Sequence, residues 1–135
     1  MELNKHEIGF LNFVEPAQSR RLSALLTAGP KGRRKFNKLL AHNIQLNPQY
    51  SRLVDSNLSA VDDILSLLRK FGAGNQCYVL SEIQEIDRQS LDLIEALNAS
   101  VGNDAGTFVS SIPGKLGYFE YEDIGERYLL TRQID

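Results

Sequence analysis

Five basic side chains crowd one short stretch of the sequence, GPKGRRKFNKLL at residues 29–40: Lys31, Arg33, Arg34, Lys35 and Lys38. In a helix over residues 30–42, all of them except Arg33 follow the i, i+3, i+4, i+7 spacing of a single face. The helix dipole disfavours cations in the first turn, whereas it favours a bound anion there. The stretch therefore suggests a site for an anion or for a phosphate backbone.

The alternative is a solvated helix face that is balanced by acidic groups elsewhere. Residues 1–52 hold nine Lys or Arg and three Asp or Glu, a net +6, whereas residues 53–135 hold six and fourteen, a net −8. The two parts could face each other within one fold or in a head-to-tail dimer. Nucleic acid is disfavoured as the ligand, because the pI is about 5.7 and no helix-turn-helix, zinc-finger or RNP pattern is present.

Other residue types that carry chemistry lack the spacing that a catalytic or metal site needs. His6 and His42 form no HExxH motif. Cys77 is the single cysteine and lies in an apolar run, which is typical of a buried thiol. Ser110 precedes a Pro-Gly turn and lacks the GxSxG pattern of a nucleophile elbow. The acidic residues near Glu120 would lie at a hydrated hairpin tip, which does not separate carboxyl pKa values. We predict no metal and no cofactor.

Length and composition predict one domain over residues 1–135. The chain is 42% apolar and 24% charged, which is ordinary for a globular protein. It has no run of the ~18 apolar residues that a membrane span requires, and its first residues lack the pattern of a signal peptide. Together with the single cysteine, these features predict a cytoplasmic protein of bacterial type that is not bound to a membrane.

Apolar residues at helical spacing predict a helical, basic N-terminal part over residues 1–54. Asn4 is expected to cap the first helix, Pro16 to begin the second, and Gly29 with Pro30 to separate the second from the third. A further helix is predicted in the segment SNLSAVDDILSLLRKFG, residues 56–72, with Ser59 and Asp62 as a capping pair and Gly72 at its end.

The acidic part, residues 55–135, adds to this last helix a β-α-β-β-β pattern with strands at 76–83 and 107–112 and a hairpin around 123–126. Pairing Glu122 with Arg127 would place Phe119 opposite Leu130 on a core face, with Tyr118 and Glu120 on a wet face. The predicted fold class is α+β, with helices packed on a small mixed or antiparallel sheet of about four strands.

These observations favour a small cytosolic protein that is not an enzyme and works by contact with a protein partner or with a second copy, as a homo-oligomer. Four apolar residues of the N-terminal helices are expected to exceed what one core can hold and to form the interface: Phe10, Phe13, Leu25 and Leu26. The alternative is a regulator that binds an anion or nucleic acid through the basic helix at 30–42. A small hydrolase is the third reading.

Overall fold

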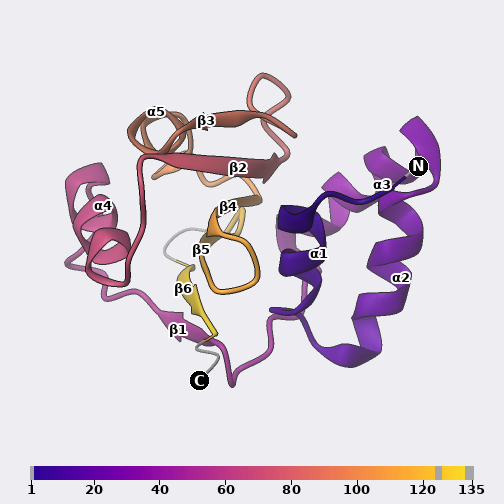
Figure 1. The fold of residues 1–135 in the computed structure, drawn as a ribbon, viewed down its shortest axis with the longest axis horizontal. Helices are drawn as coiled ribbons and strands as arrows, with labels where there is room; N and C mark the ends of the chain where they lie inside the picture. Colours follow the sequence, from indigo (N-terminus) through magenta and orange to yellow (C-terminus); the bar gives the residue numbers. More distant parts are fainter. Residues whose placement is uncertain (1, 124–125, 133–135) are drawn as a thin grey trace.

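The computed structural model describes residues 2–123 and 126–132 (Figure 1). Its described helices are α1 (Lys5–Leu11), α2 (Pro16–Leu26), α3 (Gly29–His42), α4 (Val61–Lys70) and α5 (Leu93–Ser100). Its described strands are β1 (Ser51–Leu53), β2 (Gln76–Ser81), β3 (Ser90–Asp92), β4 (Thr107–Ile112), β5 (Leu116–Glu120) and β6 (Arg127–Thr131). The strands form one sheet in the order β1-β6-β5-β4-β2-β3, and all neighbours are antiparallel.

The predicted α+β class is confirmed, but the sheet has six strands instead of about four. The two additional strands, β1 and β3, form the edges of the sheet and have three residues each. Runs this short show no measurable alternation of apolar and polar residues, which explains why the sequence pattern did not reveal them.

Local signals explain where several helices begin and end. Asn4 Oδ1 accepts a hydrogen bond from the Glu7 N–H at 2.8 Å, and the Glu7 carboxylate accepts one from the Asn4 N–H at 3.1 Å. This reciprocal pair is a capping box. Gly29, with φ of +78°, lies at the junction of α2 and α3, and Gly72, with φ of +104°, follows α4. Glycine adopts this left-handed conformation without a steric penalty.

The N-cap of helix α4 is Ala60, one residue after the predicted cap Ser59, so the predicted capping pair of Ser59 and Asp62 is shifted by one position. The Ala60 N–H donates to the Asp63 carboxylate at 3.3 Å, and Val61 is the first helical residue. Alanine has no side-chain acceptor to return the bond, so only half of a capping box is formed.

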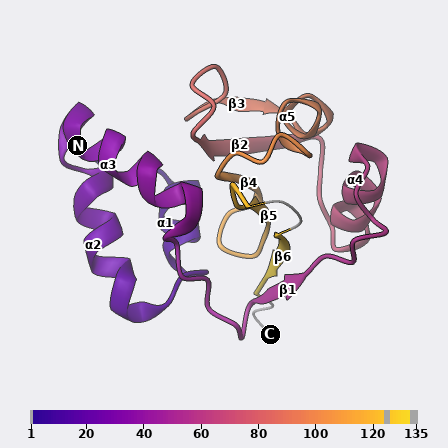
Figure 2. The ribbon, with the colours of Figure 1, turned by 180° about the vertical axis from the view of Figure 1, so that it is seen from behind.

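The sheet is covered on both faces, as the opposite views in Figures 1 and 2 show, because α1–α3 pack on one face and α4 and α5 on the other. The core beneath α1–α3 includes Phe10, Phe13, Leu22, Phe36, Leu40, Leu80, Phe108 and Phe119. The core beneath α4 and α5 includes Ile64, Leu68, Val79, Leu93, Leu97, Val109 and Tyr118. Because side chains alternate along a strand, neighbouring residues of β2 and β4 enter different cores.

The hairpin of β5 and β6 corrects the predicted register and the predicted wet face. Phe119 pairs with Tyr128, and Glu120 pairs with Arg127, two residues away from the predicted pairing. A shift of two residues preserves the faces of a strand, so Phe119 still faces a core. The opposite face is not wet, because the layer that contains α5 covers Tyr118 and Glu120, which are both 0% exposed.

The expectation that the N-terminal helices carry more apolar surface than one core can hold is also corrected. Phe10, Phe13 and Leu26 are at most 1% exposed, and Leu25 is half-buried against the same core. The sheet of the same chain covers these side chains, so the three buried ones offer no surface to a partner. No helix among the described residues is both long and apolar enough to cross a membrane.

Candidate anion-binding site

The basic residues of α3 lie in two different environments. Arg33 is only 6% exposed, whereas the other four are exposed to solvent: Lys31, Arg34, Lys35 and Lys38. Arg33 precedes Phe36 by three positions and Leu40 by seven, and both of these side chains are fully buried. Arg33 therefore belongs to the inward stripe of the helix, a signal that the sequence contained.

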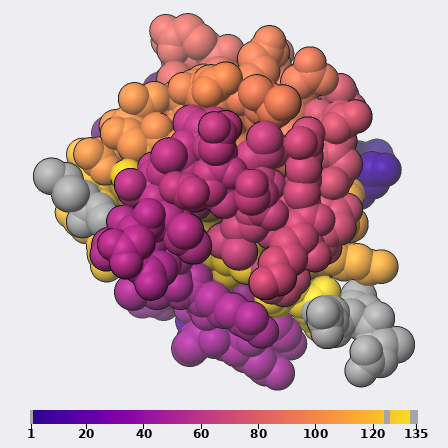
Figure 3. Space-filling model, turned by 90° about the vertical axis from the view of Figure 1, so that its left-hand side faces the viewer, coloured from indigo at the N-terminus to yellow at the C-terminus, as the bar shows by residue number. Residues whose placement is uncertain are grey.

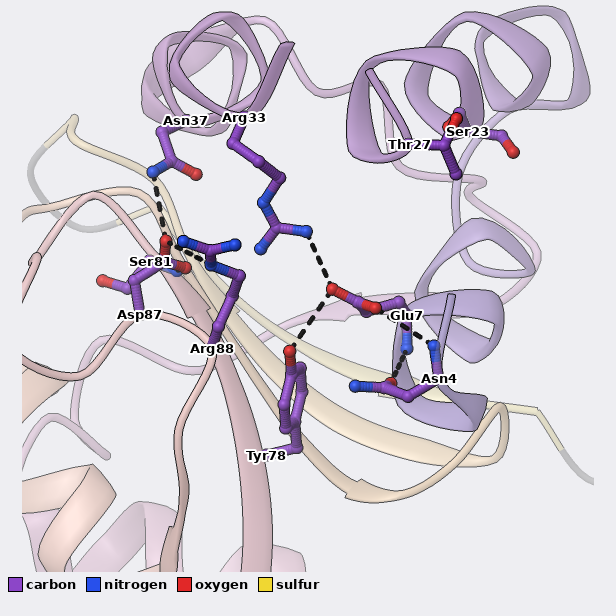
Figure 4. Close-up of polar contacts among 10 residues, drawn as sticks. All are labelled: Asn4, Glu7, Ser23, Thr27, Arg33, Asn37, Tyr78, Ser81, Asp87 and Arg88. Carbon is purple, nitrogen blue, oxygen red and sulfur yellow. Dashed lines mark hydrogen bonds and ion pairs between the residues drawn. The ribbon is translucent and has the colours of Figure 1, made fainter. Parts of the chain in front are cut away.

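Arg33 forms a buried ion pair with Glu7 of α1. Its Nη1 atom donates to Glu7 Oε2 at 2.8 Å, and the two side chains are 7% and 8% exposed. The Tyr78 hydroxyl of β2 donates to the same carboxylate oxygen at 3.3 Å. Burial, followed by the negative charge of Glu7, raises the pKa of Tyr78, so the phenol stays protonated. Figure 4 shows the three side chains converging from α3, α1 and β2.

The Arg33 guanidinium is only partly satisfied by this pair. Its Nε and Nη2 atoms are inaccessible to solvent and have no hydrogen-bond partner among the described residues. The Phe36 ring lies 5.9 Å from the guanidinium carbon, a cation–π contact that offsets part of the lost hydration. An unpaired buried donor still costs about 1–3 kcal/mol, and a charged one costs more. Arg33 therefore holds donors that a ligand could satisfy.

A hollow of about 750 Å³ is lined by α1, α2, Tyr50 and Arg132, while a smaller one, about 560 Å³, lies beside Arg33. In the larger hollow, the Arg132 guanidinium lies 4.9 Å from the Tyr50 ring. Among the residues that the structure describes, none that lines this hollow is a buried polar side chain without a partner. We therefore place the candidate site in the smaller hollow, between α3 and the loop 82–89 that joins β2 to β3, and call it the α3–loop hollow.

Three kinds of polar side chain line the α3–loop hollow. Arginines and amides supply hydrogen-bond donors: Arg33, Arg34, Arg88, Asn37, Gln84 and Gln89. Two carboxylates, Glu82 and Asp87, lie among them. Because α3 begins at this end and no side chain caps its first turn, the positive end of the helix dipole adds to the arginine charges. The hollow can therefore attract an anion.

Asp87 and Arg88 fix the shape of the loop. The Asp87 carboxylate accepts hydrogen bonds from the Ser81 N–H at 2.9 Å and from Asn37 Nδ2 at 3.2 Å, which ties the loop to α3. Arg88 has a positive φ of +61°, an uncommon conformation for a residue other than glycine. Its half-exposed side chain makes only a 3.7 Å ion pair with Asp87, and Figure 4 shows its guanidinium directed toward the space that Arg33 faces.

Glu82 reduces the negative charge of the hollow when it is protonated. Burial raises the pKa of Glu82, and the neighbouring carboxylate of Glu122 raises it further, while a hydrogen bond from the Gly106 N–H at 2.6 Å opposes both. A carboxyl that takes up a proton more readily than usual makes the site more attractive to anions as the pH falls.

A histidine and a serine that are distant in the sequence meet on the same side of the sheet. His6 Nδ1 lies 2.7 Å from Ser110 Oγ, and the His6 ring stacks on Tyr78 with centroids 5.4 Å apart. Burial, and then the charge of Lys5, lowers the pKa of His6, which favours the neutral imidazole. This is the geometry of a general base beside a nucleophile. Ser110 is only 1% exposed, however, and its hydroxyl is engaged with His6 inside the fold, so the hydrolase hypothesis gains no support from this pair.

The other candidates for chemistry have structural roles. Burial raises the pKa of Cys77 to about 12, and its thiol packs in the core beneath α4 and α5, as expected. Among residues 2–123 and 126–132, no three potential metal ligands come together. The ion pairs found in this part of the chain join residues of the same half, Arg33 with Glu7 and Arg127 with Glu120 among them. They do not join the basic half to the acidic half.

Comparison with protein-family models, curated proteins and solved structures found no match. The geometry of the α3–loop hollow is therefore the observation that bears most directly on function.

Proposed function

We propose that this protein is a non-enzymatic binding protein that captures a small anion in the α3–loop hollow. The observation that carries the proposal is the buried Arg33 guanidinium, which uses Nη1 for Glu7 and leaves Nε and Nη2 without a partner beside the hollow. An oxyanion accepts charge-assisted hydrogen bonds from such donors, and these are roughly twice as strong as neutral ones. The sequence left two interpretations of the basic helix, an anion site and a solvated face. The unpaired donors of Arg33 favour the anion site.

Arg88 controls how an anion reaches Arg33. The two free nitrogens have no accessible surface, so a side chain of the hollow must move before they can bind a ligand. Arg88 is the mobile candidate, because its side chain is 50% exposed and its pair with Asp87 is long, at 3.7 Å. An anion between Arg33 and Arg88 would also separate two positive charges that point into one space (Figure 4).

The test is an NMR titration with inorganic phosphate, in which the chloride concentration is lowered as phosphate is added so that the ionic strength stays constant. Saturable shifts are expected for the amide signals of residues 31–37 and 82–89 and for the Arg33 Nε–H signal. The variant that carries Glu7→Gln and Arg33→Met should lose them. It removes both charges together, so no unpaired buried carboxylate is left, and glutamine can still return the capping bond to Asn4.

Lys38→Met is the matched control, because Lys38 is an exposed cation of the same helix and is outside the lining of the hollow. It should bind phosphate as the wild type does. Shifts that do not saturate, or that persist in the Glu7→Gln and Arg33→Met variant, would contradict the proposal.

Self-association is a second candidate function, and a different surface favours it. Hydrogen bonds from Thr131 N to Tyr50 O and from Val54 N to Arg127 O frame the pairing of β1 with β6. By the alternation of antiparallel pairs, the N–H and C=O groups of Leu53 point away from the sheet. Leu53 is 65% exposed. Figure 3 shows the side of the molecule on which α4 and the segment before it, in magenta, lie in front of the yellow C-terminal part of the chain.

The occupant proposed for this edge is a second copy of the chain. Antiparallel pairing of β1 with the same strand of the copy, with Leu53 opposite Leu53, would let these outward N–H and C=O groups bond to each other about a two-fold axis. Leu53→Lys should then convert a dimer to a monomer in light scattering, whereas Ile94→Lys, at another exposed apolar residue, should not. A wild-type monomer at high concentration would exclude this candidate.

The predicted cytoplasmic location belongs to the same proposal. Cys77 is a buried free thiol, and a reducing compartment preserves free thiols.

A further inference from the structure

The α3–loop hollow contains an unsatisfied acceptor as well as unsatisfied donors. Asn37 Nδ2 donates to Asp87 Oδ2 at 3.2 Å, which fixes the orientation of the amide. Its other atom, Oδ1, is inaccessible to solvent and finds no donor among the described residues. Asn37 lies one helical turn after Arg33 and lines the same hollow. A ligand that satisfied both residues would need acceptor atoms for Arg33 and a donor for Asn37.

We propose, building on the anion site described above, that the ligand is a small phosphate monoester that also carries hydroxyl or amino groups. The phosphate oxygens would accept from Arg33 and Arg88, and a hydroxyl or amino group would donate to Asn37 Oδ1. Guanidinium groups from two walls suit a tetrahedral phosphate, whose oxygens point in several directions. The volume of about 560 Å³ is within the range of sites for small molecules.

The same chemistry argues against a nucleic-acid backbone. A run of phosphodiesters presents acceptors only, and it would pass close to the carboxylates of Glu82 and Asp87, which line the hollow. Nucleic-acid binding also requires several cations along a surface, whereas Arg33 is buried and turned away from the exposed Lys31 and Lys35. The arrangement is built for one anionic group.

The experiment compares methyl phosphate with glycerol 1-phosphate, two monoesters that share the phosphate and differ in hydroxyl groups. Calorimetric titration at constant ionic strength should give the hydroxylated ester roughly fivefold tighter binding to the wild type, the contribution of about one hydrogen bond. Asn37→Ala should reduce this ratio to about one. Any loosening of the loop by the substitution affects both ligands, so the ratio isolates the contact with Oδ1.

Three outcomes would overturn the inference, and each leaves a different conclusion about the site. Equal binding of the two esters by the wild type would reject the hydroxyl contact and leave the anion site standing. If Asn37→Ala still bound glycerol 1-phosphate more tightly than methyl phosphate, a residue other than Asn37 would accept the hydrogen bond from the hydroxyl group. Binding of a short single-stranded DNA that is tighter than that of either ester and falls steeply with salt would replace the monoester with nucleic acid. If inorganic phosphate also fails to bind, the proposed function itself is rejected.

Discussion

Each face of the sheet buries a glutamate and a tyrosine beside an arginine, yet the two sets differ in how completely their hydrogen-bonding groups are satisfied. The Glu7 cluster, beneath α1 and α3, consists of Glu7, Arg33 and Tyr78. The Glu120 cluster, on the other face, consists of Tyr118, Glu120 and Arg127. Composition alone would assign the same role to both clusters.

The Glu120 cluster uses one carboxylate as the acceptor for a whole loop. Glu120 accepts from the Gly102 N–H at 3.1 Å, the Asp104 N–H at 2.9 Å and the Tyr118 hydroxyl at 2.6 Å. Arg127 Nε lies 3.5 Å from it, and Arg127 Nη1 donates to a backbone carbonyl at 3.0 Å. The cluster therefore holds the α5–β4 loop against the sheet.

In the Glu7 cluster the unsatisfied group is the cation, and it lies beside a hollow. Arg127 also has an Nε atom without a hydrogen bond, but it lies near the Glu120 carboxylate. The difference shows that a buried ion pair indicates a ligand site only where its free donors adjoin space that a ligand can enter. Substitutions in each cluster test this difference.

The largest effect is expected for Glu120→Ala. The change leaves two backbone N–H groups and a phenol without their acceptor and leaves the Arg127 charge without its partner. Removing one member of a buried pair typically costs about 3–5 kcal/mol, and urea denaturation should show a loss of this size. Phosphate binding by the folded fraction should remain. A loss of less than about 1 kcal/mol in the free energy of unfolding would mean that the Glu120 cluster does not hold the loop against the sheet.

The second effect separates stability from binding in the Glu7 cluster. Replacing a whole buried pair with groups of similar volume is often neutral or stabilising, so Glu7→Gln with Arg33→Met should change the free energy of unfolding by less than about 1 kcal/mol. Arg33→Met alone should cost more, because it leaves the Glu7 carboxylate uncompensated. The measurement is urea denaturation of the three proteins. If the double variant is as unstable as the single one, Arg33 is needed for folding rather than retained for a ligand.

The third effect concerns the two tyrosines at high pH. Burial raises the pKa of Tyr118 far above its ordinary 10.0, and the Glu120 charge adds to this; the pKa of Tyr78 is also raised. A pKa that is higher in the folded state contributes stability that is complete below the unfolded pKa and is lost as the pH rises. The free energy of unfolding should therefore fall above a pH of about 10, and less steeply in Tyr118→Phe.

These titrations are best made in a Cys77→Ala background, because the raised pKa of Cys77, from 9.0 to about 12, contributes a fall of the same sign. At neutral pH, Tyr118→Phe should cost about 1 kcal/mol for its lost hydrogen bond. Tyr78→Phe should cost less, because its bond to Glu7 is longer, at 3.3 Å. If the free energy of unfolding fell equally steeply with pH in Tyr118→Phe and in its parent, Tyr118 would not be a cause of the fall.

The smallest effect is a pH dependence of anion binding. Sulfate is a suitable probe, because its charge does not change between neutral pH and pH 5. The raised pKa of Glu82 means that a falling pH removes a negative charge from the hollow, so sulfate affinity should rise by about threefold. The charges of Glu122 and His42 also act on Glu82, so the effect of Glu82 is taken as the difference between the profiles of the wild type and of Glu82→Gln. A profile that is unchanged in this variant would exclude Glu82 as its cause.

The sequence predicted the elements whose signals are local. Asn4 and Gly72 marked helix ends correctly, and the apolar stripes of α1–α4 were visible as periodicity. The burial of Arg33 was predictable as well, since it shares the stripe of Phe36 and Leu40. The wet face assigned to Glu120 was wrong because alternation along a strand shows two faces but not which of them a second layer covers.

The candidate site was predicted only in part, because half of it comes from a segment with no pattern. The basic helix was identified from its charges, but the partners of Arg33 are Glu7, 26 positions away, and Tyr78. Arg88 is itself the left-handed residue of its loop. The sequence contains no sign of this, because glycine or asparagine is the usual residue in that conformation. Contacts between distant segments depend on the tertiary fold, which periodicity does not report.

The pairing of β1 with β6 joins residues 51–53 to residues 128–130, so the sheet is completed only after nearly all of residues 1–135 have been synthesised. A ribosome adds about 5–20 residues per second, so α1–α3 leave the exit tunnel several seconds before β4, β5 and β6 exist. The apolar faces of these helices have no sheet to cover them in that interval. The nascent chain therefore exposes apolar side chains until the sheet forms, and the completed chain is expected to fold on the intermediate timescale of domains that mix helices and strands.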